Sequence, residues 1–356
     1  MRAVPDPVSD VPGLFGVPGL SDVPVLPGAP VLSDIPVLDV AGLHVGFGDV
    51  EAVRGVSLQV RRGETHCLVG ESGCGKSALA LAVMGLLVRG ARRTAGRLRF
   101  GDIDLLPLSD RAMGRLRGDR IGMVFQDPMT SLNPAYTVGS QLTEVYRHHR
   151  GGHHRGGARG AAVERAAELL GRVGIAAPGL RMRQFPHQLS GGLRQRVMIA
   201  LALICSPALL IADEPTTALD VTVQAGILRL LMGLQADMGL ALLLITHDLG
   251  VVARVAHRVS VMYAGEIVES APVADLFAHP SHPYTQGLLA SVPVPGQGRR
   301  DQPLGSIPGT VPRLPPGFVG CGFRGRCAHA MPACADPVPL RRRTPDHAYL
   351  CLLPPA

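Results

Sequence analysis

The sequence predicts an α/β fold in which short apolar strands alternate with helices. Residues 65–69 form an apolar strand that runs into a glycine-rich loop, and residues 77–87 after this loop form an apolar helix. A second apolar strand, 209–212, ends in two carboxylates, and a third precedes His247. Apolar strands separated by helical stretches are typical of a mostly parallel sheet covered by helices.

The composition is consistent with a sizeable core. The chain has 356 residues, enough for one large domain and a smaller one. Hydrophobic residues make up 46%, but aromatic residues only 4% with no Trp, so aliphatic side chains must fill the core. The net charge of +7 comes from an arginine-rich composition. We interpret it as a mildly basic surface and expect no nucleic-acid partner.

Neither a transmembrane helix nor a signal peptide is expected. A helix needs about 20 apolar residues to cross a bilayer, and the richest run, 200–212, is interrupted by Ser206 and Pro207. The N-terminus has no charged segment followed by a continuous apolar stretch. We therefore expect a cytosolic protein able to dock on a membrane partner, in which the 7 cysteines form no disulfide framework.

The chain divides into three predicted regions. Residues 1–36 are rich in proline and repeat the pattern Ser-Asp-Val/Ile-Pro every twelve residues, and we expect a disordered leader there. The strand and helix pattern occupies residues 37–275. Within it, the sequence RHHRGGHHRGGARG at 147–160 predicts a loop, because its glycines give the histidines no rigid frame for a metal. Residues 276–356 form a C-terminal region, with a Pro- and Gly-rich stretch at 292–320.

The loop after the first apolar strand reads G-x-x-x-x-G-K-S, the phosphate-binding P-loop pattern. Its Lys76 is the only lysine of the chain, which otherwise uses arginine. A compact ammonium fits beside a phosphate cradled by backbone N–H groups, whereas a planar guanidinium is bulkier. The strand and helix around it are the context a P-loop requires. The predicted nucleotide-binding residues here are Gly70, Glu71, Ser72, Gly73, Cys74, Gly75, Lys76, Ser77 and Ala78.

Cys74 lies in this loop just before a predicted helix N-terminus. Such a position lowers thiol pKa values, so Cys74 is a candidate reactive thiol. The alternative is an inert small residue that the loop tolerates.

The strand at 209–212 is followed by Asp213 and Glu214, which after a P-loop resembles a Walker B strand. Mg²⁺ prefers oxygen ligands, and Ser77 and Asp213 can supply them. Glu214 would orient or deprotonate the attacking water. Removal of a general base typically lowers the rate by about 10²–10⁴.

Residues 189–195, LSGGLRQ, place a serine and two glycines before a helical run. An exposed helix N-terminus of this kind attracts anions. The pattern L-S-G-G-x-x-Q resembles the signature of the ABC transporter ATPases. Other motifs are similar to that family in the expected order: Phe47, Gln126 in VFQDP, Asp220 in ALD, and His247 in ITHD.

The resemblance implies an α/β P-loop ABC ATPase core over 37–275, with a helical subdomain at about 127–205 and an irregular cysteine-containing tail. It implies that Phe47 stacks on adenine, that His247 contacts the γ-phosphate, and that Gln126 is a Mg²⁺ ligand and moves with the permease. The family works as a head-to-tail dimer. The signature residues, which serve the partner's ATP, would be Ser190, Gly191, Gly192 and Gln195, and Asp220 would lie in the D-loop.

Two stretches of sequence point to one group within this family. FQDPMTSLNP at 125–134 and HPYTQGLL at 282–289 resemble the ATPase subunits of oligopeptide, dipeptide and nickel importers. This implies ATP-driven peptide import at the cytoplasmic face of the membrane, with a second ATPase chain, two permease subunits and an extracytoplasmic binding protein. Import of nickel or another small solute stays open. A soluble ABC ATPase of translation or DNA repair, or a regulator without catalysis, is a further alternative.

Four cysteines lie in the last 36 residues: Cys321, Cys327, Cys334 and Cys351. Four thiolates suit an iron–sulfur cluster or structural zinc. The stretch GCGFRGRC at 320–327 resembles a cluster-binding pattern of some peptide-importer ATPases. We expect a 4Fe–4S cluster, with zinc or metal-free thiols as alternatives.

Overall fold

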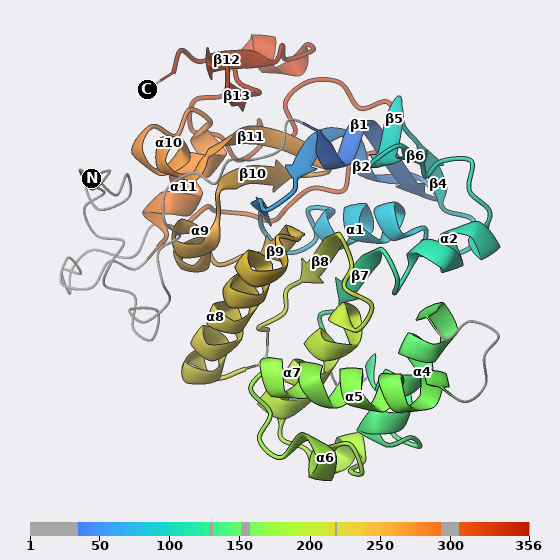
Figure 1. Cartoon of the computed structure of the whole chain (residues 1–356). Coiled ribbons are helices and arrows are strands. Elements are labelled where there is room, and N and C mark those ends of the chain that lie inside the picture. Colours follow the sequence, from blue (N-terminus) through green and yellow to red (C-terminus); the bar gives the residue numbers. More distant parts are fainter. Residues whose placement is uncertain (1–34, 128–130, 151–156, 218, 293–305, 356) are drawn as a thin grey trace. The chain divides into compact units, whose positions relative to one another are not determined.

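A computed structural model describes residues 35–127, 131–150, 157–217, 219–292 and 306–355 (Figure 1). It divides into two compact units. The first contains residues 1–106 and 244–356, and the second contains residues 107–243. Strand β9 (Ala241–Thr246) crosses the boundary. We describe each unit separately.

The first unit contains an antiparallel sheet in the order β2-β1-β5-β6, with β4 also paired to β1. Alternating burial along β2 (Val50–Arg61) shows that one face of this sheet covers the core. The other strands of this sheet are β1 (Pro36–Phe47), as long as β2, and the shorter β4 (Arg92–Thr94), β5 (Arg97–Phe100) and β6 (Ile103–Asp104).

The same unit contains strands of a second sheet, in which β3 (Thr65–Val69) pairs in parallel with β10 (Arg258–Tyr263). Every residue of β3 is buried. Strand β11 (Glu266–Pro272) continues antiparallel to β10, followed by β13 (His347–Tyr349) and β12 (Arg341–Thr344). The helices of this unit are α1 (Lys76–Met84), α9 (Leu249–Val255), α10 (Val273–Ala278), α11 (Pro283–Ala290) and the 3₁₀ turn η3 (Pro332–Ala335).

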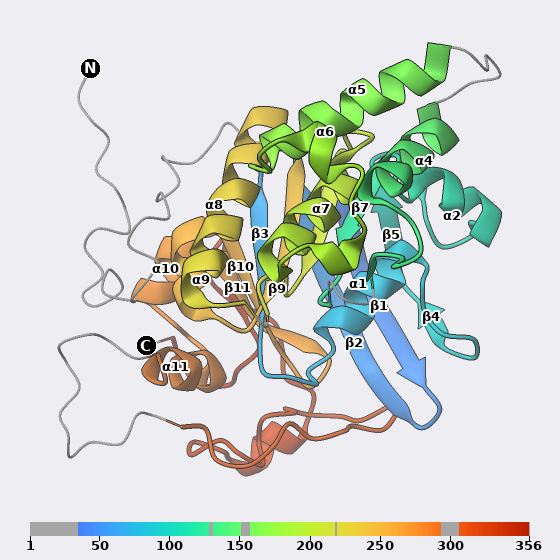
Figure 2. The ribbon, with the colours of Figure 1, turned by 90° about the horizontal axis from the view of Figure 1, so that it is seen from below.

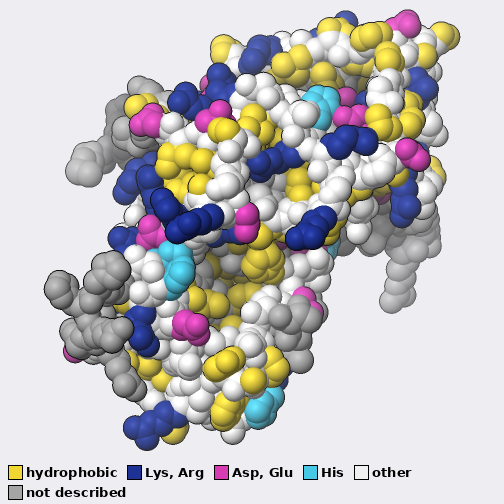
Figure 3. All heavy atoms as spheres, turned by 90° about the vertical axis from the view of Figure 1, so that its right-hand side faces the viewer, with side chains coloured by type: hydrophobic (Ala, Val, Ile, Leu, Met, Phe, Trp, Pro, Cys, Tyr) yellow, Lys and Arg dark blue, Asp and Glu magenta, His cyan; other side chains and the backbone are white. Residues whose placement is uncertain are grey.

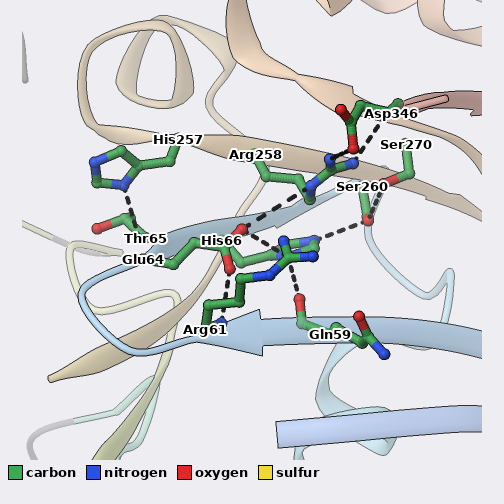
Figure 4. Close-up of polar contacts among 10 residues, drawn as sticks. All are labelled: Gln59, Arg61, Glu64, Thr65, His66, His257, Arg258, Ser260, Ser270 and Asp346. Carbon is green, nitrogen blue, oxygen red and sulfur yellow. Dashed lines mark hydrogen bonds and ion pairs between the residues drawn. The ribbon is translucent and has the colours of Figure 1, made fainter. Parts of the chain in front are cut away.

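The C-terminal hairpin β12–β13 is fixed to this unit by a polar network (Figure 4). The guanidinium of Arg258 donates to the backbone oxygen of Asp346 at 3.0 Å and to its carboxylate at 3.2 Å. Beside it, the buried ring of His66 bonds to the Gln59 carbonyl and to Ser260, both at 2.9 Å. The bonds of His66 pair a buried ring that would be costly to leave without partners, whereas the Arg258–Asp346 bonds lie at the surface.

In the second unit β7 (Ile121–Val124) pairs in parallel with β8 (Leu209–Asp213). A Cβ at Gly122 would collide with the carbonyl oxygen of Ala202, so glycine lets α7 approach β7 closely. Helices α4, α5 and α7 pack on one another (Figure 2). The helices are α2 (Asp110–Leu116), α4 (Val138–Arg150), α5 (Gly157–Arg172), α6 (Pro178–Arg181), η2 (Pro186–Gln188), α7 (Gly191–Leu203) and α8 (Val221–Met238).

The predicted loop at 147–160 differs from the structure at both ends. Helix α4 continues to Arg150 and α5 begins at Gly157, while residues 151–156 lie outside the described part. The last turn of α4 is basic, which favours a helix C-terminus. Arg150 also pairs with Asp119 at 2.9 Å and donates to the Cys205 carbonyl at 2.9 Å. Of the predicted leader, 1–36, residues 1–34 lie outside the described part as well, and Pro36 already belongs to β1.

The surface carries mixed charges. In the face drawn in Figure 3, arginines and acidic side chains are interspersed among polar and apolar atoms. Among the described helices, none is both long enough and apolar enough to cross a bilayer.

Candidate nucleotide-binding site

The P-loop joins β3 to α1 in the first unit, as the sequence predicts. Its glycines are required by close backbone approaches. Gly75 has φ 109°, and a Cβ there would collide with the carbonyl oxygen of Ala52. At Gly70 a Cβ would collide with the carbonyl oxygen of Met262. The loop therefore presses against β2 and β10 with no room for side chains at these two positions.

Lys76 is the first residue of α1 and is only 5% exposed. Its ammonium donates to the carbonyl oxygens of Gly70 at 2.7 Å and Glu71 at 3.0 Å. The charge is thus held inside the loop by two carbonyl dipoles that an anionic phosphate can replace. Ser72, Gly73 and Ser77 are exposed, and Ala78 is half-buried.

Cys74 is buried at 1% exposure. Burial raises the pKa of its thiol, against the smaller opposing effect of Lys76. The hypothesis of a reactive thiol is therefore wrong in its premise, because loss of water around the sulfur outweighs the nearby positive charge. The interpretation as a small packing residue fits the structure.

Two further candidate residues belong to this unit. Phe47 ends β1 and is half-buried, and His247 follows β9 and is exposed. Asp248 after it caps α9, accepting from the backbone N–H groups of Gly250 at 2.8 Å and Val251 at 3.2 Å. The sharp turn after β9 is thereby fixed, which holds the His247 backbone in place.

In the second unit β8 brings Asp213 to its buried end, and Glu214 follows in a left-handed conformation with φ 46°. The Glu214 carboxylate accepts from the Gln126 amide at 3.3 Å and from the Thr217 hydroxyl at 2.9 Å. The structure thus brings together the predicted general base and the predicted Q-loop glutamine. A non-glycine residue with positive φ is uncommon, and such conformations cluster at functional sites.

The signature residues separate into two groups. Ser190 and Gly191 are exposed at the N-terminus of α7, where the Ser190 hydroxyl caps the helix at 3.4 Å from the Leu193 nitrogen. Gly192 is half-buried. Gln195 is buried instead, and its amide donates to the Pro215 carbonyl at 2.5 Å, next to Glu214. The first group is accessible to a second molecule, whereas Gln195 is bonded inside its own chain to the loop that carries Glu214.

Asp220 caps α8, accepting from the backbone N–H of Val223 at 2.9 Å. Its neighbour Ala218 in the predicted D-loop lies outside the described residues.

The predicted magnesium ligands are divided between the two units, with Ser77 in the first and Asp213 and Gln126 in the second. Each of these side chains offers oxygen, the donor type that Mg²⁺ prefers.

The four tail cysteines line one small cavity of about 20 Å³ together with Phe323, Met331 and Leu352. Even so, no group of three or more His, Cys, Asp or Glu side chains in the described part of the chain is arranged to hold a metal ion. The predicted iron–sulfur cluster is therefore wrong, and the zinc alternative has no support either. Burial raises the pKa of the Cys321 thiol to about 11 and also raises those of Cys327 and Cys351, so the free side chains are neutral thiols at neutral pH.

Two C-terminal residues that sequence reasoning missed contact the P-loop. The hydroxyl of Tyr284 accepts from the backbone N–H of Glu71 at 2.9 Å. Arg326 forms an ion pair with the Glu71 carboxylate at 2.5 Å. The HPY and cysteine motifs marked these stretches as unusual, but nothing in the sequence indicated where they pack.

Two family models match the chain. One, described as ABC transporter, matches residues 53–217. The other, described as oligopeptide/dipeptide transporter, C-terminal region, matches residues 268–334.

Curated proteins resemble almost the whole chain. A probable peptide ABC transporter ATP-binding protein of Sinorhizobium fredii, y4tR, is 50% identical over 88% of this chain and 93% of its own length. The dipeptide transport ATP-binding protein DppD of Bacillus subtilis is 48% identical, with the same shares covered.

Among solved structures, the dimeric bacterial ABC transporter cassette MJ0796 superimposes with a TM-score of 0.58 at 29% identity, covering 66% of this chain and 98% of that one. These similarities confirm the predicted ABC ATPase fold. The chain belongs to the ABC transporter ATP-binding proteins, in the group whose C-terminal region is of the oligopeptide/dipeptide transporter type.

Proposed function

We propose that the chain is the ATP-hydrolysing subunit of a peptide importer. Membership of the ABC family makes it an ATPase. The observation that carries the choice of cargo is the similarity, at about half of all positions and over nearly the full length, to proteins described as peptide or dipeptide transport ATP-binding proteins. The family match of the C-terminal region supports the same choice over nickel or another solute.

The proposed roles follow the order of the reaction. The P-loop backbone and Lys76 bind the phosphates, with Phe47 against the adenine. Glu214 holds the attacking water as general base and is itself oriented by Gln126 and Thr217. His247 contacts the γ-phosphate. Bound Mg²⁺ would neutralise phosphate charge, held by Ser77, Asp213 and Gln126. Phosphoryl transfer needs mostly positioning and charge stabilisation, which these residues supply.

The proposed assembly is a head-to-tail pair of ATPase chains, in which the exposed N-terminus of α7 with Ser190, Gly191 and Gly192 meets the partner's nucleotide. We propose a second, different ATPase chain, two permease subunits on the membrane and an extracytoplasmic binding protein. Closure of the pair by ATP would move the permease through the loop that carries Gln126.

An uptake experiment tests the cargo. Cells that lack this gene receive the wild-type chain or the Glu214→Gln variant, and uptake of labelled dipeptide, oligopeptide and nickel is measured. We expect the wild-type chain alone to restore peptide uptake. Restored nickel uptake with unchanged peptide uptake would contradict the proposal.

A further inference from the structure

The second residue of the P-loop is tied to the C-terminal region by three bonds. The Glu71 carboxylate receives two parallel bonds from the Arg326 guanidinium, at 2.5 and 3.0 Å. The Glu71 backbone N–H donates to the Tyr284 hydroxyl at 2.9 Å. The carbonyl oxygen of the same residue accepts from Lys76 at 3.0 Å. Glu71 thus connects the phosphate-binding lysine to residues more than 200 positions away in the sequence.

The guanidinium of Arg326 is itself held rigidly. Its Nε donates to the Pro308 carbonyl at 2.7 Å, and one Nη donates to the Ile307 carbonyl at 2.9 Å. It also lies over the ring of Tyr263, 5.7 Å from the centroid. The Arg326 side chain is 7% exposed, and the bonds to Glu71 raise its pKa. The Glu71 side chain is 30% exposed, so the pair is partly buried, and its bidentate geometry makes it more directional than a single-bonded surface ion pair.

Tyr284 is equally fixed. It is 0% exposed and packs edge-on against Tyr263 at 4.6 Å, with Phe323 at 5.4 Å. Phe323 belongs to the same cysteine-containing stretch as Arg326 and also contacts Tyr263 at 5.1 Å. Aromatic pairs in such edge-on arrangements stabilise one another beyond the burial of their surface. Glu71 of the P-loop is therefore bonded to residues of the C-terminal region that are themselves fixed by aromatic packing.

We propose that Arg326 and Tyr284 are positioning residues for the P-loop, through which the C-terminal region sets the affinity for ATP. When ATP binds, Lys76 must leave the Glu71 carbonyl for a phosphate. The bonds to Arg326 and Tyr284 keep the Glu71 peptide in place during this exchange. Without them the loop would have to be ordered by the nucleotide itself, and that ordering lowers affinity.

The experiment measures ATP affinity and hydrolysis of the full chain. Equilibrium binding of ATP gives Kd, and steady-state hydrolysis gives KM and kcat, for the variants Arg326→Gln, Glu71→Gln, the double variant and Tyr284→Phe. Arg324→Gln is the matched control, because this arginine lies two residues away, over the Phe318 ring, and donates to the Val319 carbonyl. The thermal midpoint of each variant without nucleotide reports folding.

We expect Arg326→Gln to raise Kd and KM for ATP by about tenfold, the loss typical of a charge-assisted hydrogen bond, with a much smaller change in kcat. The double variant should be no weaker than either single variant, because both remove the same pair. Arg324→Gln should bind ATP like the wild type. A folded Arg326→Gln with wild-type ATP affinity, or additive losses in the double variant, would overturn the proposal.

Tyr284→Phe keeps the aromatic packing and removes only the acceptor of the Glu71 N–H. If Arg326→Gln does not fold, Tyr284→Phe is the variant that tests the proposal. A rise in Kd by about threefold or more supports the proposal. An unchanged Kd in that situation would refute it.

Discussion

At the scale of single residues, the site depends on a few atoms with strict steric and electrostatic requirements. Lys76 is buried between two carbonyl oxygens, and Glu214 is held by Gln126 and Thr217. The first arrangement suits a phosphate, and the second suits a carboxylate kept ready to accept a proton. Replacement of either charged group should affect one step and leave the other intact.

Glu214→Gln should separate hydrolysis from binding. The amide keeps the shape of the side chain but cannot accept a proton, so hydrolysis should fall by about 10²–10⁴. The Kd for ATP should stay within a few-fold of the wild type, since the phosphates are held by the P-loop. Rapid-quench measurement of ADP release together with equilibrium ATP binding checks this. A variant that still hydrolyses ATP at the wild-type rate would remove Glu214 from the chemistry.

Two glycines of the P-loop offer a matched steric comparison. Gly73 and Gly75 both have left-handed φ angles, of 81° and 109°. A Cβ at Gly73 meets nothing within 4 Å, whereas one at Gly75 collides with the Ala52 carbonyl. Gly73→Ala should lower the free energy of unfolding by about 1–2 kcal/mol from backbone strain alone. Gly75→Ala should lower it by a further 1–3 kcal/mol or so. Urea unfolding measures both, and equal losses would contradict the steric account.

At the scale of secondary-structure elements, the strand, loop and helix around the P-loop follow from local sequence. Five buried residues make β3, glycines make the turn, and Gly85 ends α1 with φ 63°. The helical ends of the 147–160 stretch were not predictable in this way. Their histidines and glycines favour a loop locally, and the contacts of Arg150 with Asp119 and Cys205 override that preference.

Asp220 has a capping role and a predicted D-loop role that can be separated. It caps α8, a helix of 18 residues. Asp220→Ala should lower the free energy of unfolding by about 1 kcal/mol, and Asp220→Ser should restore most of it. Both variants should lose hydrolysis if the carboxylate acts across the dimer. Full hydrolysis by Asp220→Ser, measured alongside thermal unfolding, would leave only the capping role.

At the scale of the whole chain, the ATPase motifs and the family were predictable because each motif is a contiguous stretch. The tie between Glu71 and Arg326 was not, since 255 residues separate them and no local pattern indicates their contact. The cysteine-containing tail was also not predictable from local sequence. The resemblance of the stretch GCGFRGRC to a cluster-binding pattern predicted a cluster, but how the four cysteine side chains are arranged is decided by tertiary packing.

Stability should fall with acid because of two buried histidines. Burial lowers the pKa of His66 to about 3 and that of His282 to about 4, from an ordinary 6.5. Below pH 6.5 both histidines become protonated in the unfolded chain but stay neutral in the folded chain. Because the unfolded state binds more protons, the free energy of unfolding decreases as pH falls. The slope should reach up to about 1.4 kcal/mol per pH unit for each histidine.

Urea unfolding at pH 7.5, 6 and 5 measures this slope. His66→Gln should flatten it, because glutamine has no proton to take up. An unchanged free energy of unfolding between pH 7.5 and pH 5 would show that the two rings are hydrated in the folded chain.

The most direct test of the central claim is ATP hydrolysis by the assembled transporter in lipid vesicles. The complex of this chain, its ATPase partner and the two permease subunits is assayed with binding protein added empty, loaded with dipeptide, or loaded with nickel. Peptide import predicts that dipeptide-loaded binding protein raises hydrolysis well above the empty form, and that Glu214→Gln abolishes the rise. Hydrolysis that responds to nickel and ignores peptide would contradict the account.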